Sequence, residues 1–230
     1  MPRPIIVFDL DGTLVDTAPD LAAAMTAVLA HYDREAVPTE SVRDMVGHGA
    51  RRTIEKGLAL TGGGTGPMLD EGLPLFLDHY RANICVHSRP YDGVDAVLEQ
   101  LSTDATLAIC TNKPKSLADA LIEELGWHAR FAAILGADSL SVKKPDPQHL
   151  LETISQSRGD PTRAAMIGDS SSDMLAGQAA KVPTVLCTFG YLDKPVAELP
   201  HDAAITSWSE LPAALRRVQP AIWSGDGAST

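Results

Sequence analysis

The sequence predicts an α/β protein in which a doubly wound parallel sheet forms the core and a helical cap domain is inserted into that core. Two observations predict this class. From residue 89 onward, short apolar segments alternate with helical segments, as they do when crossover helices connect parallel strands. Residues 16–86 hold helix-like segments without a convincing strand between them. The predicted core therefore comprises residues 1–15 and 87–230, and the predicted cap comprises residues 16–86.

The first strand is expected at residues 4–10, where no polar residue occurs before Asp9, as in strands that are buried on both faces. The first cap helix is expected to begin at Thr17, because Thr17 and Asp20 have the spacing of a capping box. The apolar residues that follow share one helical face: Leu21, Met25, Val28, Leu29 and Tyr32. Three further cap helices are predicted, at residues 39–46, 50–60 and 67–86.

The remaining core elements alternate along the chain. Strands are predicted at residues 105–111, 132–135, 164–167, 183–187 and 203–205. Helices are predicted at residues 93–101, 114–125, 147–157, 171–180 and 209–218. Pro114 near the first turn of the second of these helices, and Gly126 just after it, are typical start and stop signals. This order of elements is Rossmann-like, and such sheets bind ligands at the carboxyl ends of their strands.

Composition and charge narrow the possible functions. The formal net charge of −11, from 30 acidic and 19 basic residues, disfavours binding to nucleic acid or to anionic membranes. Three cysteines without a CxxC pair predict neither a disulfide framework nor a thiolate zinc site, which fits a reducing compartment. The apolar run at residues 5–8 is too short for a signal peptide, and no later run could span a bilayer. We therefore expect a cytoplasmic protein without nucleic-acid or membrane partners.

Polar residues follow four of the predicted strands, at residues 9–13, 111–113, 143–145 and 168–173. Asp9 and Asp11 are two residues apart and can face one crevice. Asp169 and Asp173 are four residues apart at the start of a helix and can share a side. If these four carboxylates converge, their mutual repulsion raises their pKa values unless a cation lies among them. Because all these ligands are oxygen atoms, Mg²⁺ is expected rather than zinc or copper, and Mg²⁺ implies a phosphate-bearing substrate.

Four motifs occur in order along the chain, each after a predicted strand: DLDGTLVDT, TNK, KKPDP and GDSSSD. With these motifs the sequence resembles the haloacid dehalogenase superfamily of phosphatases. The resemblance runs from residue 5 to about residue 191, and the helical segment lies where that family places its cap domain. Two stretches, DLDGTLVDTAPDLAAA and TNKP, are most similar to the phosphoglycolate phosphatase branch of the superfamily.

The resemblance implies a role for each of the four acids. Asp9 would be the nucleophile that attacks phosphorus and carries an aspartyl-phosphate intermediate. Asp11 would protonate the leaving alkoxide and then take a proton from water, and its backbone carbonyl would be a Mg²⁺ ligand. Asp169 would bind the metal through its side chain. Asp173 would be either a second ligand or an acceptor that orients metal-bound water or Lys144. The implied metal set is therefore Asp9, Asp11, Asp169 and Asp173.

The resemblance also implies the substrate-binding residues of the core. Thr111 and Asn112 would bind the phosphoryl oxygens, which gain charge in the transition state. Lys144 stands directly before a proline, as the family pattern requires, and would neutralise the phosphoryl group and Asp9. Its neighbour Lys143 competes for this role.

In the predicted cap, a substrate carboxylate would need a cationic partner. Two glycines, Gly47 and Gly49, let the backbone approach a ligand and are followed by Arg51 and Arg52. Arginine can hold a carboxylate through two hydrogen bonds. Consecutive helical residues face different ways, so at most one of the pair points inward, and we assign Arg51. The scattered histidines have no metal-ligand spacing and are expected to be surface or structural residues: His79, His87, His128, His149 and His201.

These features predict a Mg²⁺-dependent phosphomonoester hydrolase acting on a small phosphorylated acid, with 2-phosphoglycolate as the expected substrate. The alternative enzyme is a sugar phosphomutase or a sugar phosphate phosphatase of the same superfamily, and multiple-turnover phosphate release separates the mutase from the hydrolase. The non-enzymatic alternative is a phospho-acceptor switch module, which has no use for Asp11 or for a cap. The sequence does not predict the oligomeric state.

Overall fold

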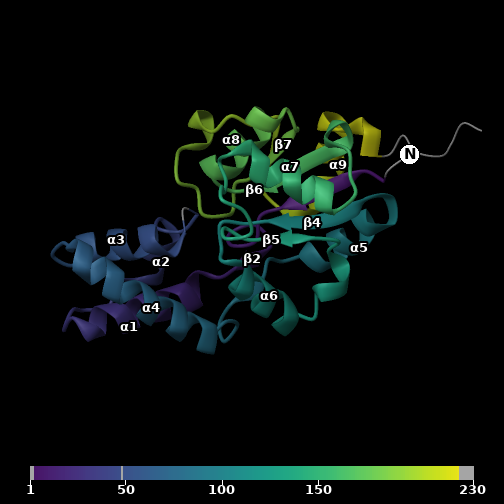
Figure 1. The fold of residues 1–230 in the computed structure, drawn as a ribbon. Helices are drawn as coiled ribbons and strands as arrows, with labels where there is room; N and C mark the ends of the chain where they lie inside the picture. Colours follow the sequence, from purple (N-terminus) through teal and green to yellow (C-terminus); the bar gives the residue numbers. More distant parts are fainter. Residues whose placement is uncertain (1–2, 48, 223–230) are drawn as a thin grey trace, which may run out of the picture.

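The computed structural model describes residues 3–47 and 49–222, which form two adjoining lobes (Figure 1). Within these ranges the larger lobe holds a sheet of six parallel strands in the order β5-β4-β1-β6-β7-β8. Their bounds are Ile5–Phe8 for β1, Thr106–Cys110 for β4, Ile134–Leu135 for β5, Ala164–Gly168 for β6, Thr184–Cys187 for β7 and Ala203–Ile205 for β8. From β1 the chain adds β4 and β5 toward one edge of the sheet, and it then adds β6, β7 and β8 toward the other edge. The strand order therefore changes direction at β1. The carboxyl end of β1 is therefore the place where sheets of this class bind ligands.

Helices cover both faces of the sheet, as predicted. Their bounds are Val94–Asp104 for α5, Lys115–Glu124 for α6, Pro147–Gln156 for α7, Ser171–Ala180 for α8 and Leu211–Val218 for α9. In Figure 1, α7 and α8 lie above the sheet and α5 and α6 lie below it. The side chains of β1 alternate accordingly, since Ile5 and Val7 belong to the apolar cluster of α7, and Ile6 and Phe8 to the cluster of α5 and α9. The α/β class is thus confirmed, with β1 buried on both sides.

Short 3-10 helices occur in the connections of the core: His128–Arg130, Pro161–Arg163, Val196–Glu198, Trp208–Glu210 and Pro220–Ile222. The predicted helix at residues 209–218 is therefore shorter, because its first residues lie in the turn before Leu211. Among the described residues, no helix is both long and apolar enough to cross a membrane.

The smaller lobe is helical and lies beside the carboxyl edge of the sheet (Figure 1). It contains α1 (Ala18–His31), α2 (Thr39–Arg43), α3 (Ala50–Leu60) and α4 (Gly66–Ala82). Helix α4 packs against α1 and α3, around buried residues that include Met25, Val28, Ile54 and Phe76. His48 lies outside the described residues.

A short antiparallel ribbon, which the sequence analysis missed, joins the two lobes. It pairs β2 (Val15–Asp16) with β3 (Arg89–Pro90). Two-residue strands show no alternation of apolar and polar residues, so their pairing leaves no readable pattern in the sequence. The ribbon lies at the predicted domain boundary, and the division into residues 1–15 with 87–230 and residues 16–86 remains a prediction.

The capping box predicted for Thr17 and Asp20 is wrong. Thr17 does occupy the N-cap position of α1, but within the described residues its side chain makes no capping hydrogen bond. The buried Asp20 carboxylate instead accepts hydrogen bonds from the backbone N–H groups of His87 and Ser88 at 3.0 and 2.8 Å and from the Ser88 hydroxyl at 2.6 Å. A tertiary contact has therefore replaced the expected local one, and it ties the first cap helix to the segment that returns to the core.

Candidate active site

Asp9 and Asp11 follow directly after β1, at the carboxyl edge of the sheet. The backbone N–H of Leu10 donates to Asp9 Oδ1 at 2.7 Å. Gly12 then turns the chain with φ 80°, and a β-carbon at this position would lie 2.2 Å from Asp169 Oδ2. Only glycine fits here, because a side chain would require an unfavourable backbone conformation and would also displace a carboxylate.

Lys144 lies within the acidic cluster and has no exposed side-chain surface. Its ammonium group lies 3.1 Å from Asp9 Oδ1 and 2.6 Å from Asp173 Oδ1. Burial opposes its charge, but the carboxylates of Asp173 and Asp9 raise the pKa of Lys144, so it remains protonated. Asp173 Oδ2 also accepts hydrogen bonds from the N–H and hydroxyl groups of Ser170, which cap α8. Lys144 is thus the cation that lies between Asp9, the candidate nucleophile, and Asp173 of the last motif.

Asp169 is the third buried acid of this cluster. It accepts hydrogen bonds from the Thr13 hydroxyl at 2.8 Å and from the Tyr191 backbone N–H at 2.5 Å. One carboxylate oxygen from each of Asp9, Asp169 and Asp173 lies within 4.8 Å of the other two. Burial, together with repulsion by Asp173 and Asp9, raises the pKa of Asp169 well above its usual range. Burial likewise raises the pKa of Asp9 to about 6, against the attraction of Lys144.

These three acids fit a bound divalent cation. Their ligand atoms are all oxygen, which suits a hard ion such as Mg²⁺. The raised pKa values of Asp9 and Asp169 indicate that one lysine does not compensate the buried negative charge, and a cation among the oxygens would do so.

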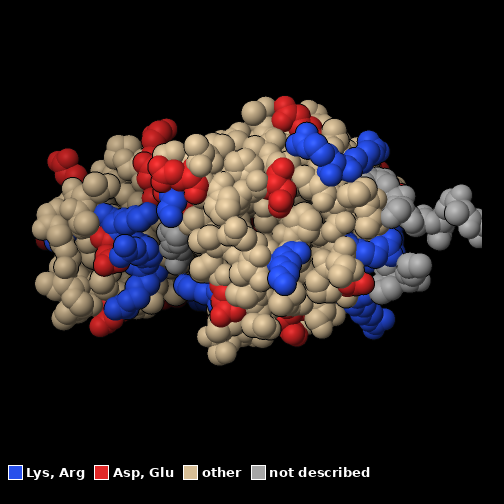
Figure 2. Space-filling model, turned by 90° about the horizontal axis from the view of Figure 1, so that it is seen from above, with Lys and Arg blue, Asp and Glu red and all other residues tan. Residues whose placement is uncertain are grey.

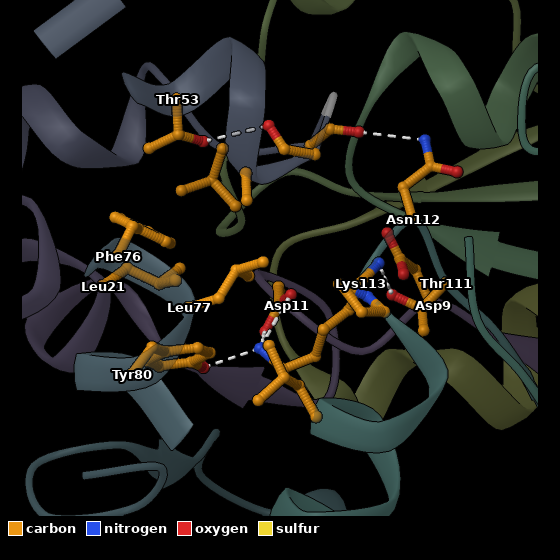
Figure 3. Close-up of a pocket in the computed structure, with 16 residues that line it drawn as sticks. Asp9, Asp11, Leu21, Thr53, Phe76, Leu77, Tyr80, Thr111, Asn112 and Lys113 are labelled. Atoms are coloured by element: carbon orange, nitrogen blue, oxygen red, sulfur yellow. Dashed lines mark hydrogen bonds and ion pairs between the residues drawn. The ribbon is translucent and has the colours of Figure 1, made fainter. Parts of the chain in front are cut away.

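The expected convergence of four carboxylates is found for three of them. Asp11 instead directs its carboxylate toward Lys113, whose ammonium group lies 2.9 Å from Asp11 Oδ1 and 3.3 Å from Oδ2. Lys113 also donates to the Tyr80 hydroxyl at 2.6 Å and lies 4.2 Å from the centre of the Tyr80 ring. Figure 3 shows Tyr80, Lys113 and Asp11 meeting at the cavity that lies between cap and core.

The amino-acid sequence that forms this site also matches a family model. Residues 6–187 match the haloacid dehalogenase-like hydrolase family. The chain belongs to the haloacid dehalogenase-like hydrolase family. The predicted resemblance is thereby confirmed, and so is the expected class of enzyme, a hydrolase of phosphoric monoesters.

Related members of the hydrolase family match almost the whole chain. A phosphoglycolate phosphatase of Mesorhizobium japonicum is 46% identical over 92% of this chain and 94% of its own length. A phosphoglycolate phosphatase of Caulobacter vibrioides is 43% identical over 91% and 89%. The crystal structure of a predicted phosphoglycolate phosphatase from Haemophilus somnus superposes with a TM-score of 0.85 at 27% identity, covering 92% of this chain and 97% of that one.

The structure brings most of the predicted site residues of this hydrolase together. Asp9, Asp11, Thr111 and Asn112 line the cavity, and Lys144 with the other acids lies beside Asp9. Thr111 is buried, and its hydroxyl accepts a hydrogen bond from the Lys113 backbone N–H at 3.2 Å. Lys143 is exposed and reaches the cap, where a β-carbon built on Gly49 would lie 3.3 Å from its ammonium nitrogen.

Asn112 is held in a way that the sequence analysis did not anticipate. Its side-chain NH₂ group donates to the backbone carbonyl of Gly47 in the cap (Figure 3) and to that of Lys144 in the core, both at 3.1 Å. With both amide hydrogens engaged, a donor from this residue to a phosphoryl oxygen would have to be its backbone N–H. The contact between Asn112 and the substrate remains a prediction. In the structure, the Asn112 side chain links the cap to the core.

Arg51 does not reach the cavity in this structure. It lies on the surface of α3, with about half of its side chain exposed, and pairs with Asp70 at 2.8 Å. It is not among the described residues that line the cavity. Figure 2 shows basic side chains gathered on this part of the cap, over α2 and α3, with acidic ones among them. The assignment of Arg51 to a substrate carboxylate thus has no support from its position.

Lys113, Tyr80 and Tyr191 are the site residues that the sequence analysis missed. Lys113 belongs to the motif TNK, but only the two preceding residues of that motif were given a role. Tyr80 and Tyr191 lie far from Asp11 and Asp169 in the chain, and no spacing connects them. An available signal was that a lysine directly after a buried strand needs an acidic partner.

Proposed function

We propose that this hydrolase is a Mg²⁺-dependent phosphatase that cleaves 2-phosphoglycolate through an aspartyl-phosphate on Asp9. The observation that carries this proposal is the buried cluster of Asp9, Asp169 and Asp173, with Lys144 paired to the first and the last, which adjoins a cavity closed by the cap. The relatives named phosphoglycolate phosphatase, which match over nine-tenths of the chain, support the choice of substrate.

The hydrogen bonds of Asp9 favour its role as the nucleophile. Both the Leu10 N–H and the Lys144 ammonium contact Oδ1. With these contacts at Oδ1, Oδ2 is the candidate atom for in-line attack on phosphorus. Its attack forms the Asp9–phosphate bond and releases the alkoxide of the substrate.

Charge neutralisation allows this attack on an anionic group. When bound at Asp9, Asp169 and Asp173, Mg²⁺ would supply positive charge to the phosphoryl oxygens. The buried ammonium group of Lys144 contacts the Asp9 carboxylate and neutralises part of its negative charge. The Thr111 hydroxyl and the N–H groups of the loop after β4 provide donors for the oxygens that gain charge in the transition state.

Asp11 is positioned for proton transfer. It lies two residues after the nucleophile, and both line the cavity. It would give a proton to the departing alkoxide, and then remove one from the water that attacks the aspartyl-phosphate. The cap places apolar side chains over the cavity, including Leu21, Phe76 and Leu77, and so limits the access of bulk water during both steps.

The size of the cavity favours a small substrate. Its volume is about 40 Å³, room for a few water molecules. A two-carbon acid requires less widening of this space than a sugar phosphate or the bisphosphate intermediate of a mutase. The phosphomutase and sugar phosphate alternatives are therefore not favoured.

Phosphate release from a panel of esters, with Mg²⁺ and with a chelator, tests the proposal. We expect turnover with 2-phosphoglycolate that stops on chelation and is abolished by Asp9→Asn, with the melting temperature retained. Asp78→Asn, a change at an exposed acid of α4, is the matched control and should keep activity. Acid-quenched enzyme should carry phosphate that hydroxylamine releases. Full turnover by Asp9→Asn, or turnover indifferent to chelation, would contradict the mechanism.

We also propose that the hydrolase acts in the cytoplasm on a small phosphorylated metabolite, without nucleic-acid or membrane partners. Its net charge of −11 supports the absence of nucleic acid as a partner. The three cysteines, Cys85, Cys110 and Cys187, are all free thiols, as suits a reducing compartment.

A further inference from the structure

One cationic side chain, that of Lys113, lines the cavity among the described residues. The other charged groups that line it are the carboxylates of Asp9 and Asp11, and most of the remaining wall is apolar. A substrate carboxylate that entered this cavity without a cationic partner would be an unpaired charge in poorly solvated surroundings, which is strongly unfavourable. The position of the cation therefore determines where a carboxylate can be bound.

Lys113 is held from two sides at once. Its side chain is only 2% exposed, and its ammonium group donates to Asp11 in the core and to the Tyr80 hydroxyl of the cap. An ammonium group has three N–H donors, and the longest of its three contacts, 3.3 Å to Asp11 Oδ2, is the one that a substrate carboxylate would replace. The two partners come from different lobes, and the ammonium position depends on the closed arrangement of cap and core.

The distance from the reacting atoms also fits. Asp11, in its proposed role, contacts the oxygen that leaves phosphorus. In 2-phosphoglycolate the carboxylate carbon is two bonds beyond that oxygen. Lys113 lies 2.9 Å from Asp11 and lines the same cavity, so its charge is within reach of a carboxylate that is two bonds beyond an oxygen held at Asp11.

We propose that Lys113, held in place by Tyr80, binds the carboxylate of the substrate and so selects phosphorylated acids over uncharged phosphate esters. This inference rests on the proposed function and names the residue that determines its specificity. It gives Lys113 the role predicted for Arg51, which lies on the surface and pairs with Asp70.

A comparison of two substrates tests the inference. 2-Phosphoglycolate and 2-hydroxyethyl phosphate share the phosphoryl group and a two-carbon leaving group, but only the first carries a carboxylate. We expect wild type to prefer 2-phosphoglycolate in kcat/KM. Lys113→Met should reduce that preference about 10- to 100-fold, the effect of losing one hydrogen bond to a charged group, with the larger part in KM. Lys115→Met, at a half-buried lysine outside the cavity lining that pairs with Asp119, is the matched control and should keep the preference.

The ratio of the two kcat/KM values separates specificity from catalysis, because Lys113 also contacts Asp11. An equal loss on both substrates in Lys113→Met would overturn the inference and leave Lys113 as a positioning residue for Asp11. Tyr80→Phe, which keeps the ring and removes one hydroxyl, should lower the preference in the same direction by a few-fold. An unchanged preference in Tyr80→Phe overturns the inference even if Lys113→Met does not fold.

Three further results concern the wild type and Arg51. If wild type hydrolyses both esters without preference, the phosphatase function stands and the carboxylate inference fails. If wild type hydrolyses neither, the proposed function itself fails. Loss of the preference in Arg51→Met, with the preference intact in Lys113→Met, would show that Arg51 and not Lys113 binds the substrate carboxylate.

Discussion

Replacing Lys144 by methionine tests the electrostatic organisation of the site. The ammonium group lies 3.1 Å from Asp9 and 2.6 Å from Asp173, and neither Lys144 nor Asp173 has exposed side-chain surface. Methionine fills a similar volume but leaves the carboxylates without their cation. Removing one partner of a buried ion pair costs about 3–5 kcal/mol. For a chain of this size that corresponds to a fall in melting temperature of about 6–20 °C.

The loss of stability in Lys144→Met should depend on pH. Asp9 already has a pKa raised to about 6 in the folded protein, and removal of the attracting lysine raises it further. A carboxyl group whose folded pKa exceeds its unfolded value, near 4, destabilises the folded state increasingly as the pH rises between the two values. We therefore expect the full loss near pH 8 and less than about 2 kcal/mol near pH 5, where the acid is protonated.

Denaturant or thermal unfolding at pH 5 and pH 8, without divalent cations, measures both quantities. Lys143→Met is the matched control, because this neighbouring lysine is exposed, and it should cost less than about 1 kcal/mol. An equal loss in the two variants would refute the reasoning, as would a loss in Lys144→Met that is the same at both pH values.

The remaining predictions concern the metal and a buried histidine. Mg²⁺ at 100 times its dissociation constant should stabilise wild type by about 2.7 kcal/mol. Thermal unfolding should show that Asp169→Asn loses most of this stabilisation. If the variant is stabilised as much as wild type, Asp169 is not a metal ligand. Burial, with the nearby charge of Lys144, lowers the pKa of His149 to about 4, so wild type should lose stability as the pH falls from about 6.5 toward 4. His149→Asn, which does not titrate, should show a flatter dependence in this range, and identical profiles would contradict the assignment.

Several elements were predictable because their signals are local. Helices α3 and α8 and strand β8 agree with prediction at both ends. The apolar run before Asp9 predicted a strand buried on both faces, and β1 is such a strand. Strand β5 is shorter than predicted, with only Ile134 and Leu135 in register with β4, although Ala132 and Ala133 also share backbone hydrogen bonds with that strand. The ends of an element depend on its partners, which a local pattern does not contain.

The motif residues were also predictable, because they belong to single strand ends. The spacing of Asp9 and Asp11 and the order of the four motifs indicated an acidic, phosphate-binding site. The same reasoning did not indicate the partner of the Asp11 carboxylate, which lines the same cavity as Asp9 but pairs with Lys113. Two residues on one face of a strand share a side, but the charges around each decide where its carboxylate points.

The sequence therefore determines which chemical groups this hydrolase carries and on which strand ends they stand, since apolar periodicity and short motifs act over a few residues. The folded chain decides the pairs that connect distant segments: Lys144 with Asp9 and Asp173, Asp20 with Ser88, and Tyr80 with Lys113. Each such pair depends on distances of a few ångström between residues that are 29 to 135 positions apart in the chain. Hydrogen bonds and ion pairs require that proximity, and only the assembly of the sheet with its helices and the packing of the cap against it produce it.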